Sequence, residues 1–177
     1  MTEKGLDEGS IWPERFLFRD IRMDEKEEVT EIEQICFPPN EACSARSMKE
    51  RVETAPELFL VAEDTETGKI AGFLNGLSTK ETIFRDEFFT EIHLYDPAGE
   101  NVMLLGLDVR PEYRRQGLAR EIVRQYAERE KKNGRRRLVL TCLESKVEMY
   151  QKFGFRDLGM ANSTWGGEIW HEMDYQL

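Results

Sequence analysis

One stretch of the sequence combines residues that could bind a phosphorylated ligand. An apolar segment and a basic turn at residues 105–113 lead into RRQGLA (residues 114–119), which opens a predicted helix. The first N–H groups of a helix are unpaired and lie at the positive end of its dipole, so they attract anions. Gly117 lets the backbone approach an anion closely, and Arg114 and Arg115 add charged donors. The pattern predicts an anion site, and a pyrophosphate fits it.

Two further residues could take part in proton transfer and in stabilising an oxyanion. Tyr150 lies in MYQKFGF, and its phenol, with a pKa of about 10, can donate a proton to a leaving group. The same tyrosine could instead only pack against the preceding strand. Gly106 interrupts an apolar strand and predicts a bulge there, which would free the N–H of Leu107 to stabilise an oxyanion.

The elements that must position these residues alternate between strands and helices. Strands are expected at residues 16–21, 58–63, 69–78, 102–109, 137–142, 155–160 and 167–174, with helices from residues 24, 44 and 117 and a short one at 147–153. Asp24 and Glu27 have the spacing of a capping box at the first helix. The order predicts an α/β fold: a mixed, twisted sheet of about six to seven strands with helices on both faces.

Length and composition indicate an ordinary globular chain. Its 177 residues suit one domain, expected at 13–177 after a flexible polar leader at 1–12 that lacks the pattern of a secretory signal. No apolar run approaches the ~20 residues of a membrane span. Cys36, Cys43 and Cys142 make an odd number without CxxC spacing, which favours reduced thiols in a cytoplasmic protein.

Charge and ligand types exclude two classes of function. The chain has two histidines and no cluster of metal-ligand residues, so no metal site is expected. A net charge of -10 argues against nucleic-acid binding and favours a cationic partner such as an amine. The basic run at 131–137 follows the predicted long helix, where cations stabilise the helix C-terminus.

The two motifs, in this order, resemble those of GNAT acetyltransferases. RRQGLA matches the family's R/Q-x-x-G-x-G/A signature, and LTCLESKVEMYQKFGF (residues 140–155) resembles its next section. The resemblance implies an acyl-CoA fold in which the fourth strand pairs with the pantetheine arm of acetyl-CoA and diverges from the fifth strand. The cofactor-binding residues it implies, with Arg114 added from its charge, are Leu107, Asp108, Val109, Arg114, Arg115, Gln116, Gly117, Leu118, Ala119 and Arg120.

Within the superfamily the chain is most similar to the arylalkylamine N-acetyltransferase branch. Animal members carry two histidines on strand four, and Met103 and Leu105 stand there instead, whereas the tyrosine matches Tyr150. The resemblance implies direct acetyl transfer from acetyl-CoA to a small primary amine, with Tyr150 as the acid and Leu107 as the oxyanion donor. A peptide or protein N-terminal acetyltransferase and a non-catalytic acyl-CoA-binding regulatory module are the alternatives, and the chain could be a monomer or a homodimer.

The acceptor side has weaker signals. Glu33 lies on the first helix, which borders the amine pocket in similar proteins, although a solvated position on the helix face is an alternative. Phe37 and Trp165, together with Phe84, Phe88 and Trp170, could wall that pocket or fill the core. His93 and His171 have no evident partner, so no general base is identified, and a water relay stays open.

Overall fold

The computed structural model describes residues 15–177, and the leader expected at 1–12 lies outside them. Within the described residues one sheet has seven strands, in the order β1-β2-β3-β4-β5-β7-β6. The strands are β1 (Phe16–Asp20), β2 (Phe59–Asp64), β3 (Ile70–Thr79), β4 (Asn101–Val109), β5 (Arg137–Leu143), β6 (Arg156–Met160) and β7 (Trp170–Gln176). β4 and β5 are parallel, and the other neighbours in the sheet are antiparallel. The expected mixed sheet is confirmed.

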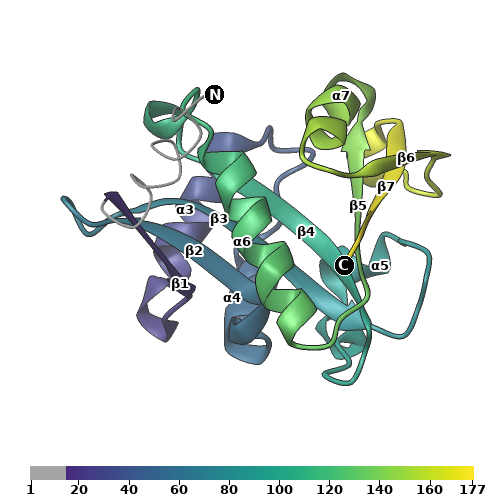
Figure 1. The fold of residues 1–177 in the computed structure, drawn as a ribbon, viewed down its shortest axis with the longest axis horizontal. Helices are drawn as coiled ribbons and strands as arrows, with labels where there is room; N and C mark the ends of the chain where they lie inside the picture. Colours follow the sequence, from purple (N-terminus) through teal and green to yellow (C-terminus); the bar gives the residue numbers. More distant parts are fainter. Residues whose placement is uncertain (1–14) are drawn as a thin grey trace, which may run out of the picture.

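Helices cover both faces of the sheet, as the sequence predicts. α6 (Leu118–Lys132) crosses one face over β2, β3 and β4, while α3 (Lys26–Cys36) and α4 (Ala45–Thr54) pack together on the other face (Figure 1). α7 (Glu144–Lys152) follows β5 and begins three residues before the expected position at Val147. The region between β3 and β4 contains one short helix, α5 (Glu87–Thr90).

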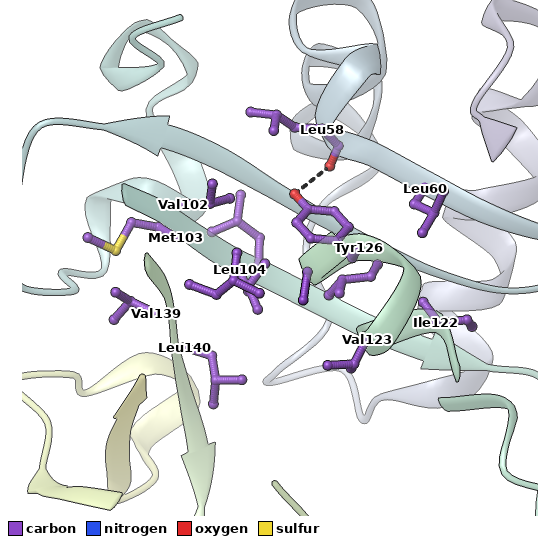
Figure 2. Packing of buried hydrophobic residues seen from close by; sticks show 14 of the residues in the cluster. Leu58, Leu60, Val102, Met103, Leu104, Ile122, Val123, Tyr126, Val139 and Leu140 are labelled. Atoms are coloured by element: carbon purple, nitrogen blue, oxygen red, sulfur yellow. Dashed lines mark hydrogen bonds between the residues drawn. The ribbon is translucent and has the colours of Figure 1, made fainter. Parts of the chain in front are cut away.

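The core lies in two layers because successive strand residues face opposite sides of the sheet. On β2, Leu60 and Ala62 join the cluster under α6, whereas Phe59 and Val61 join the cluster under α3 and α4. Figure 2 shows the first layer, in which Tyr126 of α6 reaches the sheet and its hydroxyl donates to the carbonyl oxygen of Leu58 at 3.0 Å. Packing in these two layers holds α6 and α3 on opposite faces of the sheet that contains β4.

The start of the first helix differs from the expected capping box. A 3₁₀ turn at Met23–Glu25 precedes α3, and the N–H of Arg22 donates to Glu25 Oε1 at 2.8 Å. Glu25 therefore does what was expected of Glu27, because the 3₁₀ turn moves the box two residues toward the N-terminus. α4 follows Ser44, as expected, and Ser44 caps it by accepting a hydrogen bond from the N–H of Ser47.

The two parallel strands at the centre of the sheet pair over only part of their length. The register joins Asn101–Met103 of β4 to Arg137–Val139 of β5. Beyond Met103 the strands diverge, as Figure 1 shows where β4 runs toward the start of α6 and β5 toward α7. β3 pairs Asn75 with Gly106 and Gly76 with Leu104, which leaves Leu105 as the extra residue of a bulge. Both the bulge and the divergence were expected from the sequence.

Two arginines of the basic run after α6 form ion pairs with buried carboxylates. Arg135 pairs with the buried Glu130, and Arg137 pairs with the buried Asp174. No helix formed by the described residues is long and apolar enough to cross a membrane.

Candidate functional site

A cavity of about 760 Å³ opens where β4 and β5 diverge. Its walls come from α3, β4, the start of α6, the end of β5, and α7. The lining includes both basic and acidic residues: Arg114, Arg115, Arg120 and Lys146, and Glu33 and Glu41. Its volume lies within the range of ligand pockets, about 300–1,000 Å³.

β4 turns backbone groups toward this cavity. The N–H of Arg110 donates to the carbonyl oxygen of Ala71 of β3 at 2.8 Å. Polar groups of successive strand residues point to opposite sides, so those of Asp108 also face β3, while those of Leu107 and Val109 face the space that β5 has left. Leu107 and Val109 line the cavity, and the carbonyl oxygen of Val109 already accepts from Arg114 Nε at 3.0 Å. The N–H of Val109 and the polar groups of Leu107 can therefore pair with an extended ligand that takes the place of the missing strand, and Leu107 can supply the oxyanion donor.

The anion end of the cavity is the turn that leads into α6. Arg115 and Gly117 both have left-handed backbone conformations, with φ of 64° and 81°. Turns of this kind direct successive N–H groups toward one point, and the first N–H groups of α6 have no helical partner. Leu118, Ala119 and Arg120 supply those N–H groups and line the cavity. The turn therefore fits a phosphate or pyrophosphate, as the sequence predicts.

Tyr150 faces the cavity from α7. Its ring packs edge-on against Phe153 and Phe155, with centroids 5.9 and 5.5 Å away. Burial, followed by the charges of Cys142 and Asp108, raises the pKa of the Tyr150 hydroxyl above its ordinary value. The hydroxyl has no hydrogen-bond partner among residues 15–177, so its proton is available to a ligand. The packing role weighed from the sequence is therefore confirmed, and the hydroxyl lies at the cavity.

The acceptor residues expected from the sequence converge on the same cavity. Glu33, Phe37 and Trp165 all line it. Trp165 packs on Phe89 with ring centroids 4.7 Å apart, and its Nε1–H donates to the carbonyl oxygen of Glu41 at 2.8 Å. These bonds hold the indole as a fixed wall. Glu33 is only 3% exposed, so the solvated position on the helix face is excluded.

Several expected residues lie outside the cavity lining. Asp108 and Gln116 do not line the cavity, and the Gln116 side chain donates to Tyr113 O at 2.9 Å. Phe84 and Phe88, considered as pocket walls, are each 1% exposed and fill the core instead. Phe89 is the aromatic residue of that segment that reaches the cavity. Adjacent residues in the short α5 face different ways, and the sequence carries no signal that selects between Phe88 and Phe89.

Neither histidine reaches the cavity. His171 Nδ1 lies 3.1 Å from Asp157 Oδ1, and His93 is exposed near Glu91. Among residues 15–177 there is no group of three or more His, Cys, Asp or Glu side chains placed to hold a metal ion.

Two thiols line the cavity and were not expected there. Cys36 Sγ donates to the carbonyl oxygen of Val109 at 3.3 Å, and Cys142 Sγ lies 3.4 Å from Met173 Sδ. Burial raises the pKa of both thiols, that of Cys142 to about 12. Since the thiolate is the nucleophile, both are poor candidates for a covalent acyl intermediate.

Similar proteins share this fold at low sequence identity. The loading GNATL domain of CurA from Lyngbya majuscula has a TM-score of 0.79 at 13% identity, over 91% of this chain and 97% of that chain. A phosphinothricin acetyltransferase from Sinorhizobium meliloti, in complex with AcCoA, has a TM-score of 0.65 at 18% identity over 92% and 89%. The ribosomal-protein-S18-alanine N-acetyltransferase from Escherichia coli has 0.64 at 19% over 91% and 93%. No curated protein matches the sequence significantly.

A family model identifies the chain more directly. The model of the acetyltransferase (GNAT) family matches residues 26–155, which run from the start of α3 to the residue before β6 and include the anion turn and Tyr150. The matched residues include β4 and β5, the two strands that pair over only part of their length and line the cavity. This protein is a member of the acetyltransferase (GNAT) family, and so an acyltransferase.

Proposed function

We propose that this chain transfers an acetyl group directly from acetyl-CoA to the primary amine of a small molecule. The observation that carries the proposal is the cavity between β4 and β5, which has an anion-binding turn at one part and buried acidic and aromatic side chains at another. Coenzyme A has a pyrophosphate and an extended amide arm, and these match the turn and the free edge of β4. Direct transfer needs the thioester and the amine to be held together, and one cavity can do both.

The cofactor-binding residues in this proposal act mostly through the backbone. Leu107 and Val109 pair with the pantetheine arm, while Gly117, Leu118 and the residues that follow at 119–120 bind the pyrophosphate through their N–H groups. Arg114 and Arg115 add positive charge beside it. Gln116 contributes by bonding back to Tyr113, which holds the turn, and Asp108 contributes through its place in β4.

The chemical roles follow from the same geometry. The N–H of Leu107 faces the cavity and stabilises the oxyanion that forms when the amine attacks the thioester carbonyl. Tyr150 protonates the departing thiolate, and its raised pKa keeps that proton in place throughout the neutral range. Acyl-CoA ligands bound to neighbouring structures, such as AcCoA in the Sinorhizobium meliloti enzyme, support the choice of cofactor.

A small amine is favoured as acceptor by the walls of the cavity. Trp165 packs on Phe89, and Trp170 Nε1–H donates to Trp165 O at 2.8 Å, so the aromatic side is held in place. This supports a small acceptor and agrees with the resemblance to the arylalkylamine branch. We further propose a single domain at residues 13–177, because one sheet runs from β1 to β7, and a cytoplasmic location, which the free cysteines support.

The test is a turnover screen. Purified protein with acetyl-CoA is offered arylalkylamines, polyamines, amino acids and short peptides, and released thiol and acetylated product are both measured. We expect acetylation of at least one small primary amine. Acetylation confined to peptide N-termini would replace the proposed acceptor with a peptide, and acetyl-CoA binding without any turnover would identify a binding module.

A further inference from the structure

Arg51 of α4 is a buried cation without a counter-ion. It is 3% exposed, and it forms no ion pair with a carboxylate of residues 15–177. Four other arginines with largely buried side chains each form one: Arg19, Arg110, Arg135 and Arg137. Burying a charge without a partner of opposite sign costs stability, and departures of this kind are expected at functional sites. The hydrogen bonds of Arg51 show what it holds.

The guanidinium bonds to two neutral oxygens on different segments of the chain. Arg51 Nη1 donates to Asn75 Oδ1 at 3.3 Å, and Arg51 Nη2 donates to the carbonyl oxygen of Phe89 at 2.9 Å. Asn75 belongs to β3, whereas Phe89 belongs to α5, in the segment that connects β3 to β4. Arg51 therefore ties this connecting segment to the sheet.

The sheet end of this tie lies beside the β4 bulge. Asn75 is 1% exposed, and its Nδ2 donates to the carbonyl oxygen of Gly106 at 3.3 Å. Asn75 is also the residue that pairs with Gly106 across β3 and β4, next to the extra residue Leu105. Leu105, Gly106 and Leu107 line the cavity. The guanidinium is thus anchored where β4 would supply the oxyanion donor.

The other end of the tie is a wall of the cavity. Phe89 lines the cavity, and the ring of Trp165, which also lines it, packs on Phe89 with centroids 4.7 Å apart. α5 has only four residues, so its own hydrogen bonds do little to fix Phe89 in place. Arg51 itself does not line the cavity. Its bond to the Phe89 carbonyl therefore supports the aromatic wall from behind.

We infer that Arg51 is a positioning residue that sets the distance between the Phe89–Trp165 wall and the β4 bulge. The inference rests on the proposed acetyl transfer and deepens it, because this distance selects acceptors by size. An amine with an aromatic group can contact the wall while its nitrogen lies near Leu107. A short alkylamine cannot span from one to the other, so it gains little from the position of the wall.

The first experiment measures kcat/KM for 2-phenylethylamine and for propylamine in the parent and in Arg51→Met. Methionine keeps an unbranched chain and removes both donors. We expect the phenylethylamine value to fall about 10- to 100-fold, because a misplacement of about 1 Å can cost about 100-fold in rate. The propylamine value should fall less than about threefold, since this amine does not rely on the wall for its orientation. The Kd of acetyl-CoA, measured by calorimetry, should stay unchanged.

Arg135→Met is the matched control. Arg135 is also largely buried and donates to the carbonyl oxygen of Pro97, in the same connecting segment, at 3.1 Å. It does not line the cavity, and it pairs with the buried Glu130. Arg135→Met should therefore lower the Tm, because a buried carboxylate loses a partner. The ratio of the two kcat/KM values should match that of the parent.

A double-mutant cycle tests whether Arg51 acts through Phe89. Phe89→Leu removes the ring on which Trp165 packs, and so removes the wall that Arg51 is inferred to hold. Residues that act through one another give non-additive effects. The kcat/KM of Arg51→Met/Phe89→Leu for 2-phenylethylamine should therefore lie within about threefold of the Phe89→Leu value. A purely structural role of Arg51 predicts instead that the two losses multiply.

Arg51→Lys keeps the test decisive if Arg51→Met does not fold. Lysine keeps the charge, but its single ammonium group lacks the planar fork that reaches two oxygens at once. The variant should show the same selective loss for 2-phenylethylamine, smaller in size. Kinetics like those of the parent in Arg51→Lys, with Arg51→Met unfolded, would overturn the inference.

The remaining outcomes separate this inference from the proposed function. Equal losses for the two amines in Arg51→Met, the same change of ratio in Arg135→Met, or losses that multiply in the cycle overturn the role of Arg51 while acetyl transfer stands. A parent that acetylates only amines without an aromatic group does the same. If the parent acetylates no amine at all, both are overturned.

Discussion

Both halves of β4 pair with β3, but only one of them also pairs with β5. In the closed half, Asn101–Met103 is hydrogen-bonded to Arg137–Val139, and Met103 and Val139 are fully buried. In the open half, residues 104–109 have lost β5 as a neighbour, and their free edge lines the cavity. A strand edge without a partner is a liability unless something else pairs with it. The closed half thus joins the two parts of the sheet, and the open half has backbone groups on its free edge that a ligand can pair with.

The comparison separates two kinds of mutational effect. Changes around the open half should alter binding or catalysis. Changes around the closed half should lower stability and leave the affinity for acetyl-CoA unchanged. A substitution in the closed half that also lowers this affinity would show that the halves are coupled.

The largest effect is expected at the open half, from Tyr150→Phe. The ring contacts with Phe153 and Phe155 are kept and only the hydroxyl is removed. Loss of general acid catalysis should lower kcat ~100- to 10,000-fold. The affinity for acetyl-CoA should change little, because one neutral hydrogen bond contributes about 0.5–1.5 kcal/mol. Steady-state kinetics with an accepted amine, together with thermal melting, measure both.

A different result for Tyr150→Phe would contradict the role of general acid. A kcat within about twofold of the parent, with chemistry rate-limiting, would leave the tyrosine with packing alone, and solvent would supply the proton. Because the pKa of Tyr150 is raised by burial, the parent should show no loss of kcat from its ionisation as pH rises to about 10.

The second effect tests the anion turn with a matched pair of glycines. Gly117 begins α6 with φ of 81°, and Gly134 follows its end with φ of 83°. A valine at either position incurs a similar backbone strain, of order 1–3 kcal/mol. Gly117→Val should also displace the N–H groups at the pyrophosphate and weaken acetyl-CoA binding about 10- to 100-fold, which calorimetry measures. Gly134→Val should leave the affinity unchanged, since it lies at the other end of the helix. Equal affinities for acetyl-CoA in the two variants would show that this turn does not bind the phosphates.

The third effect belongs to the closed half. Met103 is fully buried, pairs with Val139, and does not line the cavity. Met103→Ala should lower the free energy of unfolding by about 2–5 kcal/mol, because it creates a cavity in the core. In a domain of this size that corresponds to a Tm lower by about 4–20 °C. The acetyl-CoA Kd of the folded variant should match that of the parent, and a Kd raised tenfold would show that the open half depends on packing in the closed half.

The features that the sequence predicts well are those with local causes. Gly106 in an apolar strand predicted the bulge, and RRQGLA before an amphipathic helix predicted the anion turn. Both signals need only a few consecutive residues. The resemblance to a known family added that β4 and β5 diverge, which follows from the whole fold and not from either strand.

The features that escaped prediction depend on contacts between distant residues. Glu33 and Asp108 are 75 positions apart, as their numbers show, and nothing near Asp108 in sequence indicates that its side chain is buried against another carboxyl. The 3₁₀ turn before α3 moved the capping role to Glu25, whose carboxylate also accepts from Arg19 of β1. Such contacts depend on how distant segments pack together, and a short stretch of sequence carries no information on that packing.

The smallest effect on stability is expected from Tyr126→Phe, a change beside the closed half. Tyr126 of α6 is fully buried, and its hydroxyl donates to Leu58 O at 3.0 Å (Figure 2). A Cβ atom added to Gly76 would lie 3.1 Å from that hydroxyl and 2.8 Å from Met103 O, so the bond lies beside the closed half. Tyr126→Phe keeps the ring and should cost only about 0.5–1.5 kcal/mol, or a Tm lower by about 1–6 °C.

The pH dependence of this variant tests whether burial keeps the Tyr126 phenol protonated in the folded state. Burial raises the pKa of Tyr126 well above its ordinary value, so the folded parent keeps the phenol proton when the unfolded chain has lost it. The folded state then binds more protons above about pH 10, and the parent loses stability as pH rises there. Phenylalanine does not ionise, so the Tm deficit of Tyr126→Phe should shrink above pH 10. A deficit that stays constant from pH 7 to pH 11 would mean that the phenol ionises equally in both states. A change in acetyl-CoA affinity in this variant would place Tyr126 with the open half instead.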